Sequence, residues 1–197
     1  MSTALSIILF FLAVVIHEIA HGWVAYKRGD PTAKVSGRLT LNPLAHIDPM
    51  GTIIVPFFLL VSGAPFLFGW AKPVPINYWS LHNPKKDMML VGLAGPLANL
   101  ILAIIVSIIL KLHIVPVQLV FLKHFMILNV LLAVFNLIPI PPLDGSRILV
   151  GLLPAHLASY YIRLERYGFF IVFILIWLGF FQVIVWPLAG FVLQFLL

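Results

Sequence analysis

The sequence predicts an all-α polytopic membrane protein, a bundle of about four to six transmembrane helices. Its 197 residues are 62% hydrophobic and only 9% charged, which is typical of an integral membrane protein. Several apolar stretches are long enough to cross a hydrocarbon core, which takes about 20 helical residues. Because no polar stretch would form a separate soluble domain, we expect one membrane-embedded domain over residues 1–197. Its core motifs would occupy about 5–150, and C-terminal apolar helices would occupy 155–197.

The composition also limits the chemistry. The chain contains no cysteine, so disulfides and thiolate metal sites are excluded, and a metal would need histidine or carboxylate ligands. A net charge of +6 would suggest nucleic-acid binding in a soluble protein. Here, however, the basic residues flank apolar segments, as do the charges that set membrane topology. We therefore expect contact with the lipid bilayer and no nucleic-acid partner.

The first predicted helix covers residues 4–26 and carries the motif HEIAH at 17–21. At about 1.5 Å per residue this stretch can cross the bilayer, so the motif places two histidines and a glutamate inside the membrane. Ionisable groups at that depth cost roughly a few kcal/mol each and are rarely retained without a partner or a function. The motif therefore indicates a function.

The spacing of the motif predicts a metal site. His17 and His21 lie on one face of a helix, so both imidazoles can reach the same ion. Zinc suits two histidine nitrogens, a third protein ligand and one open position. Glu18 would then stand beside the metal, where it can take a proton from water. The alternative is a chance match, in which these polar residues merely face the interior of the bundle.

A basic cluster follows this helix and comprises Lys27, Arg28, Lys34 and Arg38. Since lysine and arginine concentrate on the cytoplasmic side of membrane proteins, this end is predicted to face the cytoplasm. The metal site would lie toward the cytoplasmic side of a multi-pass protein of the cell membrane. Because the site would be below the membrane surface, water would need a cavity to reach it.

The region after the basic cluster is rich in glycine and proline. KVSGRLTL at 34–41 and FLFGWAKPVPI at 66–76 are predicted to be short extended segments near the active site. Between them, residues 51–61 are apolar but few and are interrupted by Pro56, which favours a re-entrant or interfacial element. His46 is either a satisfied loop histidine or a group near the metal site.

The second predicted span covers 88–110, and NPKKD at 83–87 provides its N-terminal signal. Within it, GLAGPLANL at 92–100 contains small residues that permit close helix contact. Asn99 needs a hydrogen-bond partner in this setting. It makes either a structural interhelical bond or a contact at the metal site.

The third predicted span covers 117–138 and ends where the prolines of the run at 138–142 prevent helix continuation. Irregular backbone at membrane depth is tolerated only inside protein or around a water-filled cavity. Asp144 follows in that loop, before a short amphipathic helix to about Leu153, and is the strongest candidate for a third metal ligand. Its alternative role is to cap that helix. Residues 167–197 are almost wholly apolar and predict one more span, after which the chain turns partly back into the membrane around Pro187.

Four motifs together resemble the site-2 protease family of intramembrane zinc metalloproteases. They are HEIAH at 17–21, LNPLAHIDPMGT at 41–52, AGPLAN at 94–99 and NLIPIPPLDG at 136–145. Four motifs in the family's order are far more specific than the first alone. The resemblance implies zinc (Zn²⁺) held by His17, His21 and Asp144, with Glu18 as general base and Asn136 near the scissile carbonyl. The PDZ or CBS domains often found in the family are missing from these residues.

This resemblance predicts a zinc-dependent metalloendopeptidase that hydrolyses peptide bonds in or near transmembrane segments of other membrane proteins, as in regulated intramembrane proteolysis. An alternative is a divalent-metal transporter that uses the same cluster, but a transporter needs polar groups that continue across the membrane. A further alternative is an inactive scaffold, which the intact HEIAH and LDG motifs argue against.

Overall fold

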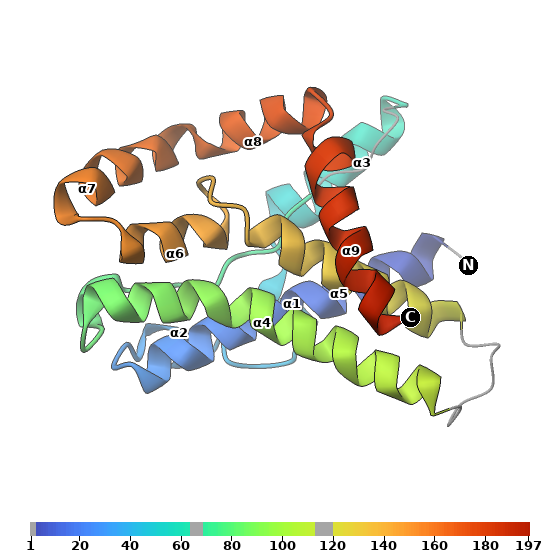
Figure 1. Cartoon of the computed structure of the whole chain (residues 1–197), viewed down its shortest axis with the longest axis horizontal. Helices are drawn as coiled ribbons and strands as arrows, with labels where there is room; N and C mark the ends of the chain where they lie inside the picture. The colour runs from blue at the N-terminus through green and yellow to red at the C-terminus, as the bar shows by residue number, and fades with distance from the viewer. Residues whose placement is uncertain (1–2, 64–68, 113–119) are drawn as a thin grey trace.

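The computed structural model describes residues 3–63, 69–112 and 120–197, and its regular secondary structure there is entirely helical (Figure 1). The predicted all-α class is therefore confirmed. The helices in chain order are α1 (Thr3–Lys27), α2 (Thr32–Val35), η1 (Pro43–His46), η2 (Pro49–Ile54), α3 (Val55–Val61), η3 (Tyr78–Ser80), α4 (Pro84–Lys111), α5 (Val120–Asn136), α6 (Asp144–Leu152), α7 (Ala155–Arg163), η4 (Leu164–Tyr167), α8 (Gly168–Trp177), η5 (Phe181–Val185) and α9 (Trp186–Leu196).

The centre of the fold is the packing of α4 against α1 and α5. Helices α1 and α5 run in the same direction and α4 runs between them in the opposite one, while α6, α7 and α8 lie along one side (Figure 1). Small or flexible side chains fill the contacts and let the backbones approach closely. Fully buried examples are Ala13, Ala103, Met126, Val130 and Ala133.

Two of the described helices are long and apolar enough to span a membrane. Leu5–Lys27 and Pro84–Lys111 have mean hydropathies of 2.0 and 2.5, and a bent pair, Ala155–Trp177 and Phe181–Leu196, makes a third span if counted together. Helix α5 is apolar but shorter, and it follows residues 113–119, which lie outside the described part of the chain. The structure is thus consistent with a membrane protein.

Helix α4 begins where its sequence signal predicts. The side chain of Asn83 accepts from the N–H of Lys86 at 3.4 Å, while the Asp87 carboxylate accepts from the N–H of Asn83 at 2.8 Å. These reciprocal bonds satisfy donors that a helix start leaves unpaired.

The prediction of an extended segment at 34–41 is wrong. Its first two residues instead belong to α2, where the Asp30 carboxylate accepts from the N–H of Thr32 at 3.0 Å and favours a helical turn, and residues 36–41 have turns and bends without strand pairing. Gly37 then reverses the chain at a φ of +65°. In the second predicted extended segment, residues 69–76 have neither helix nor strand pairing, and residues 66–68 lie outside the described chain.

The apolar stretch that is predicted to be a re-entrant or interfacial element is helical and is made of η2 and α3. The chain that contains it leaves α1 and returns to the same end, because the N–H of His82 donates to the carbonyl of Arg28 at 2.9 Å. Arg28 also lies 3.8 Å from the Asp87 carboxylate, at the start of α4. The segment between Arg28 and His82 therefore makes no net crossing of the bundle.

The C-terminal turn is misplaced in the sequence prediction. The bend of 74° falls between Trp177 and Phe181, not around Pro187. Gly179 adopts a φ of +82° in this break, a conformation that other residues rarely adopt. Pro187 lies in the first turn of α9, directly after η5, and does not end the helix.

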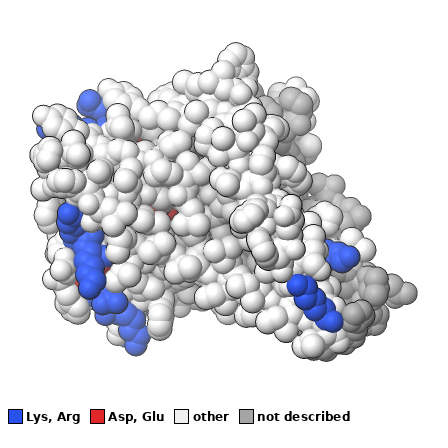
Figure 2. Space-filling model, in the orientation of Figure 1, with Lys and Arg blue, Asp and Glu red and all other residues white. Residues whose placement is uncertain are grey.

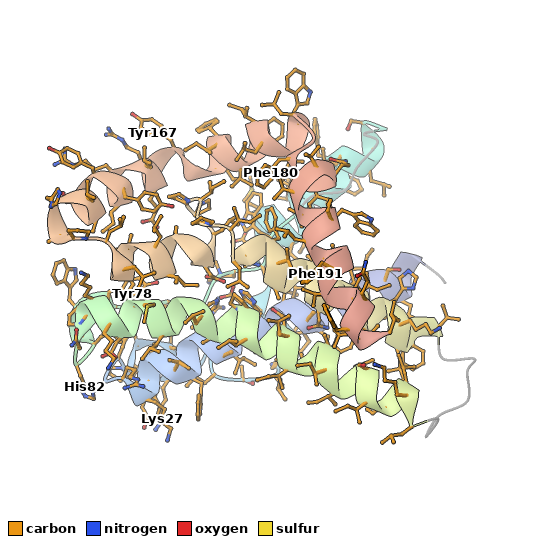
Figure 3. All side chains as sticks on the ribbon, viewed as in Figure 1. Lys27, Tyr78, His82, Tyr167, Phe180 and Phe191 are labelled. Carbon is orange, nitrogen blue, oxygen red and sulfur yellow. The ribbon has the colours of Figure 1, made fainter. Side chains whose placement is uncertain are left out.

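Basic side chains mark the two ends of the molecule. Figure 2 shows lysine and arginine gathered at the end where α1 finishes and α4 begins, a smaller group at the opposite end, and between them a surface with no lysine or arginine and only a small acidic spot. Lys27 and His82 are labelled at the first end in Figure 3. This distribution is typical of a membrane protein whose central surface, between the two basic ends, faces lipid.

Candidate metal centre and active site

Three side-chain atoms meet between α1, α4 and α6. The Nε2 atoms of His17 and His21 are 3.0 Å apart. Oδ2 of Asp144 lies 3.0 Å from Nε2 of His17 and 3.2 Å from Nε2 of His21. Both histidines are buried, and the Asp144 side chain is 19% exposed. The structure therefore brings together the three residues predicted as metal ligands.

The hydrogen bonds of the two Nδ1 atoms determine whether the Nε2 atoms carry a proton or a lone pair. Nδ1 of His21 donates to the carbonyl of Val91 at 2.7 Å, and Nδ1 of His17 donates to Oδ1 of Asn99 at 2.6 Å. Because a neutral imidazole carries a single N–H, both Nε2 atoms present lone pairs. Oδ2 of Asp144 is also buried without a hydrogen-bond partner in the described part of the chain. Three electron-rich atoms thus face one another.

A cation would relieve this repulsion, and the spacing suits zinc. Zinc binds histidine nitrogen and carboxylate oxygen at about 2.0–2.2 Å, so adjacent ligands of a tetrahedral ion lie about 3.3 Å apart. The observed separations of 3.0, 3.0 and 3.2 Å are close to that value. Three protein ligands also leave one position open, as in catalytic zinc sites.

Close packing against α4 makes this geometry possible. A Cβ on Gly95 would overlap both imidazole rings, and a Cβ on Gly92 would lie 3.0 Å from the carbonyl oxygen of Asp144. The predicted close contact at these glycines is therefore confirmed. Asp144 is the first residue of α6, and no side chain caps that helix, so the capping interpretation of Asp144 is wrong. Its carboxylate points at the histidines instead.

Glu18 lines the same cavity but does not belong to the group of three. Its Oε2 accepts a hydrogen bond of 2.8 Å from the main-chain N–H of Val74. Val74 stands between Pro73 and Pro75, which have no N–H, so this part of the chain offers the carboxylate a single donor. We call residues 72–77 the strap.

Buried charges hold the strap against the site. Arg38 donates to the carbonyls of Lys72 at 2.9 Å and Pro73 at 3.1 Å. Asp30 accepts from the N–H of Asn77 at 2.7 Å. Asp30 is 0% exposed and Arg38 is 8% exposed, so water competes little for these bonds. The strap is therefore held before and after Val74, the residue that binds Glu18.

His46 supports the strap from outside the metal site. Its Nε2 donates to the carbonyl of Thr40 at 2.9 Å, and its own carbonyl accepts from the N–H of Lys72 at 2.9 Å. The ring is fully buried and does not line the cavity. Of the two predicted alternatives, the structure favours the loop histidine, but only Nε2 is satisfied, because Nδ1 is buried without a hydrogen-bond partner among the described residues. Asn99, by contrast, does contact the site, through His17.

A cavity of about 330 Å³ opens onto the three ligand atoms and supplies the access for water that the sequence requires. Asn136, the last residue of α5, lies in its wall. Its Nδ2 donates to the carbonyl of Leu132 at 2.9 Å, which uses one of its two amide hydrogens. The other hydrogen is available to a group in the cavity.

Arg147 and Tyr78 complete the wall on the side of α6. The guanidinium lies 5.3 Å from the centre of the Tyr78 ring and donates to both carboxylate oxygens of Glu165, one of them at 3.0 Å. Glu165 belongs to η4, so this ion pair joins the catalytic region to the C-terminal helices. Tyr78 is labelled in Figure 3, above the start of α4.

Sequence reasoning missed the strap contact and one buried asparagine. The Val74 donor is a main-chain group, for which the flanking prolines are the single sequence signal. Asn129 is fully buried in an otherwise apolar stretch of α5 and hydrogen-bonds to Asn99. An amide without a hydrogen-bond partner is costly at such a depth, so an asparagine within an apolar stretch is the sequence signal for a buried hydrogen bond at Asn129.

The family model for "Peptidase family M50" matches residues 5–118 and 116–179. The chain is 40% identical to YwhC of Bacillus subtilis, over 93% of this chain and 85% of that protein. It is 32% identical to Rip2 of Mycolicibacterium smegmatis, over 85% of this chain and 64% of the relative. It is 29% identical to MJ0392 of Methanocaldococcus jannaschii, over 76% of this chain and 34% of the relative. No solved structure matches.

The names of all three relatives contain the words zinc metalloprotease. The match to the family model covers most of the chain and includes both histidines and Asp144. Together with the donor set, whose spacing suits zinc, these similarities fix the class of the protein. The chain belongs to peptidase family M50, the site-2 protease family, and is a membrane zinc metalloprotease.

Proposed function

We propose that this protein hydrolyses peptide bonds in or next to transmembrane helices of other membrane proteins, with zinc held by His17, His21 and Asp144. The observation that carries the proposal is the convergence of two histidine nitrogens and a carboxylate oxygen inside an apolar helix bundle, beside a second carboxylate that is not one of them. Zinc bound there supplies a Lewis acid that polarises a carbonyl and makes water more acidic at neutral pH.

Glu18 acts as the general base and then as the general acid. Its carboxylate removes a proton from the attacking water and delivers it to the leaving amine. The N–H of Val74 holds one carboxylate oxygen, which orients the side chain and leaves the other oxygen for proton transfer. Asn136 donates its remaining amide hydrogen to the oxyanion that develops on the scissile carbonyl.

The substrate helix must unwind locally, because its peptide bonds are shielded by their own hydrogen bonds. An unwound segment needs new partners for its backbone groups at membrane depth. The strap is suited to this role, since Pro73, Val74 and Ile76 line the cavity. The segment at 34–41 is not suited, because none of its residues lines the cavity and it begins inside α2. The substrate therefore pairs beside the strap.

The proposal is tested with the purified full chain in lipid vesicles that contain single-span candidate substrates. Cleavage within or next to the span, lost with a zinc chelator and restored by zinc, is the expected result. A protein that transports divalent ions without cleaving any membrane substrate would favour the transporter alternative.

Replacing Val74 by proline is expected to lower kcat by about ten-fold or more, because it removes the one N–H that orients Glu18. Zinc content should stay unchanged, since no ligand is touched. Val74→Ala keeps the N–H and serves as the matched control. Equal activities of the two variants would show that the strap does not position Glu18.

Residues Ser36 and Lys86 are expected to face the same side of the membrane, because the chain from Arg28 to His82 returns to its starting end. Both are exposed, whereas Arg38 is buried and holds the strap. Single cysteines at Ser36 and Lys86 should react with an impermeant thiol reagent from the cytoplasmic side, and a cysteine at Leu112 from the opposite side. Labelling of Ser36 and Lys86 from opposite sides would refute this orientation; the chain's own lack of cysteine keeps the background low.

A further inference from the structure

Three buried side chains form a hydrogen-bonded line across three helices. His17 of α1 is 2.6 Å from Oδ1 of Asn99 on α4, whose Nδ2 is 2.7 Å from Oδ1 of Asn129 on α5. Asn99 and Asn129 are both 0% exposed, and His17 is 4% exposed. The proposed zinc site is therefore connected to a residue two steps away that has no contact with the cavity wall.

The far end of this line fixes its direction. Nδ2 of Asn129 donates to the carbonyl of Phe125 at 2.8 Å, and a carbonyl can only accept. The side-chain oxygen of Asn129 must then face Asn99 and accept from its Nδ2. That same Nδ2 also donates to the carbonyl of Ala13 at 3.2 Å. Asn99 is left with its oxygen toward His17.

The consequence for His17 is a single tautomer. An oxygen at Nδ1 requires the proton to be on Nδ1, so Nε2 carries the lone pair that faces Asp144. If Asn99 turned over, its NH₂ group would face His17 and favour a proton on Nε2, inside the metal site. The amide oxygen and nitrogen have nearly the same shape, so packing alone does not prevent this reversal.

The two histidines differ in this respect. Nδ1 of His21 donates directly to the main-chain carbonyl of Val91, which cannot turn over. The tautomer of His17 depends instead on the orientation of a side-chain amide, that of Asn99, which Asn129 holds at 2.7 Å and the carbonyl of Ala13 holds at the longer distance of 3.2 Å. Partners beyond the ligands orient metal-binding histidines and commonly change metal affinity by about 10–100-fold when they are removed.

We propose that Asn129 is a positioning residue that sets the tautomer of His17 through Asn99. This inference rests on the proposed role of His17 as a zinc ligand. Asn129 touches neither substrate nor metal, so its effect reaches the site through the hydrogen-bonded line alone.

The test uses the full chain in detergent, with the zinc affinity measured by chelator competition and the tautomer of His17 by ¹⁵N NMR of the zinc-free protein. Asn129→Leu should weaken zinc binding by about 10–100-fold and shift His17 away from the Nδ1–H form. Asn129→Asp should restore both, because burial favours the neutral carboxylic acid, whose carbonyl oxygen accepts from Asn99 and whose hydroxyl donates to the carbonyl of Phe125. Ser107→Ala is the matched control, since Ser107 is also buried on α4 but donates to the carbonyl of Leu196.

Wild-type affinity and tautomer in Asn129→Leu would overturn the inference, as would an equal loss of affinity in Ser107→Ala. If Asn129→Leu does not fold, the wild-type spectrum decides, because a proton on Nε2 of His17 contradicts the proposed line directly. Failure of the zinc site itself has a different signature: His17→Ala would then bind zinc as tightly as the wild type.

Discussion

Glu18→Gln is expected to lower the rate of proteolysis by about 10²–10⁴-fold while zinc remains bound near stoichiometry. The loss is that of a general base, because an amide cannot take the proton from water. The substitution keeps the shape of the side chain, and its amide oxygen can still accept from the N–H of Val74. Cleavage of a single-span substrate in vesicles and metal analysis of the same sample give the two measurements.

His17→Ala is the contrasting variant, since it should lose activity and zinc together. Both variants should be inactive, so it is the zinc content that distinguishes the role of Glu18 from that of His17. If Glu18→Gln lost zinc as completely as His17→Ala, Glu18 would be a ligand and its assignment as base would be wrong.

Asp144→Ala is expected to weaken zinc binding by more than about 100-fold, the upper end of what loss of an indirect partner causes. Oδ2 of Asp144 is buried within 3.2 Å of both imidazoles and has no other hydrogen-bond partner among the described residues, so its removal takes away one ligand of three. Folding should persist, since alanine favours helix and no side-chain cap is lost. Metal analysis of the folded protein provides the measurement.

A variant of Asp87 on α4 provides the control for Asp144→Ala. Asp87 is also buried, but it accepts from the N–H of Asn83 at the helix start. Asp87→Ala should cost about 1 kcal/mol of stability through the lost cap and leave zinc in place. Normal zinc content in Asp144→Ala would eliminate Asp144 as the third ligand.

Local sequence patterns predicted those features that local chemistry controls. The apolar lengths of α1 and α4, the spacing of His17 and His21, and the start of α4 after Asn83 all depend on neighbouring residues. Asp144 could be identified from the sequence, because a carboxylate that follows a proline-rich break at membrane depth indicates a function.

Two of the features that sequence reasoning missed are local. The segment 34–41 begins inside α2, which Asp30 supports, and the C-terminal break contains Gly179 and lies before Pro187. The contact between Glu18 and Val74 joins positions that are remote in the sequence through a main-chain group that any residue except proline carries. The prolines beside Val74 mark its N–H as an isolated donor, but they do not identify Glu18 as the acceptor.

The ligand set has a consequence for synthesis of the protein. His17 and His21 enter the membrane with α1, but Asp144 belongs to α6, and residues 22–143 must be translated in between. At roughly 5–20 residues per second this takes on the order of ten seconds. Throughout that interval the nascent chain lacks Asp144, the proposed third zinc ligand, and on the proposed mechanism it does not cleave other unfinished helices at the insertion site. Proteolytic activity is therefore expected only after α6 has been synthesised.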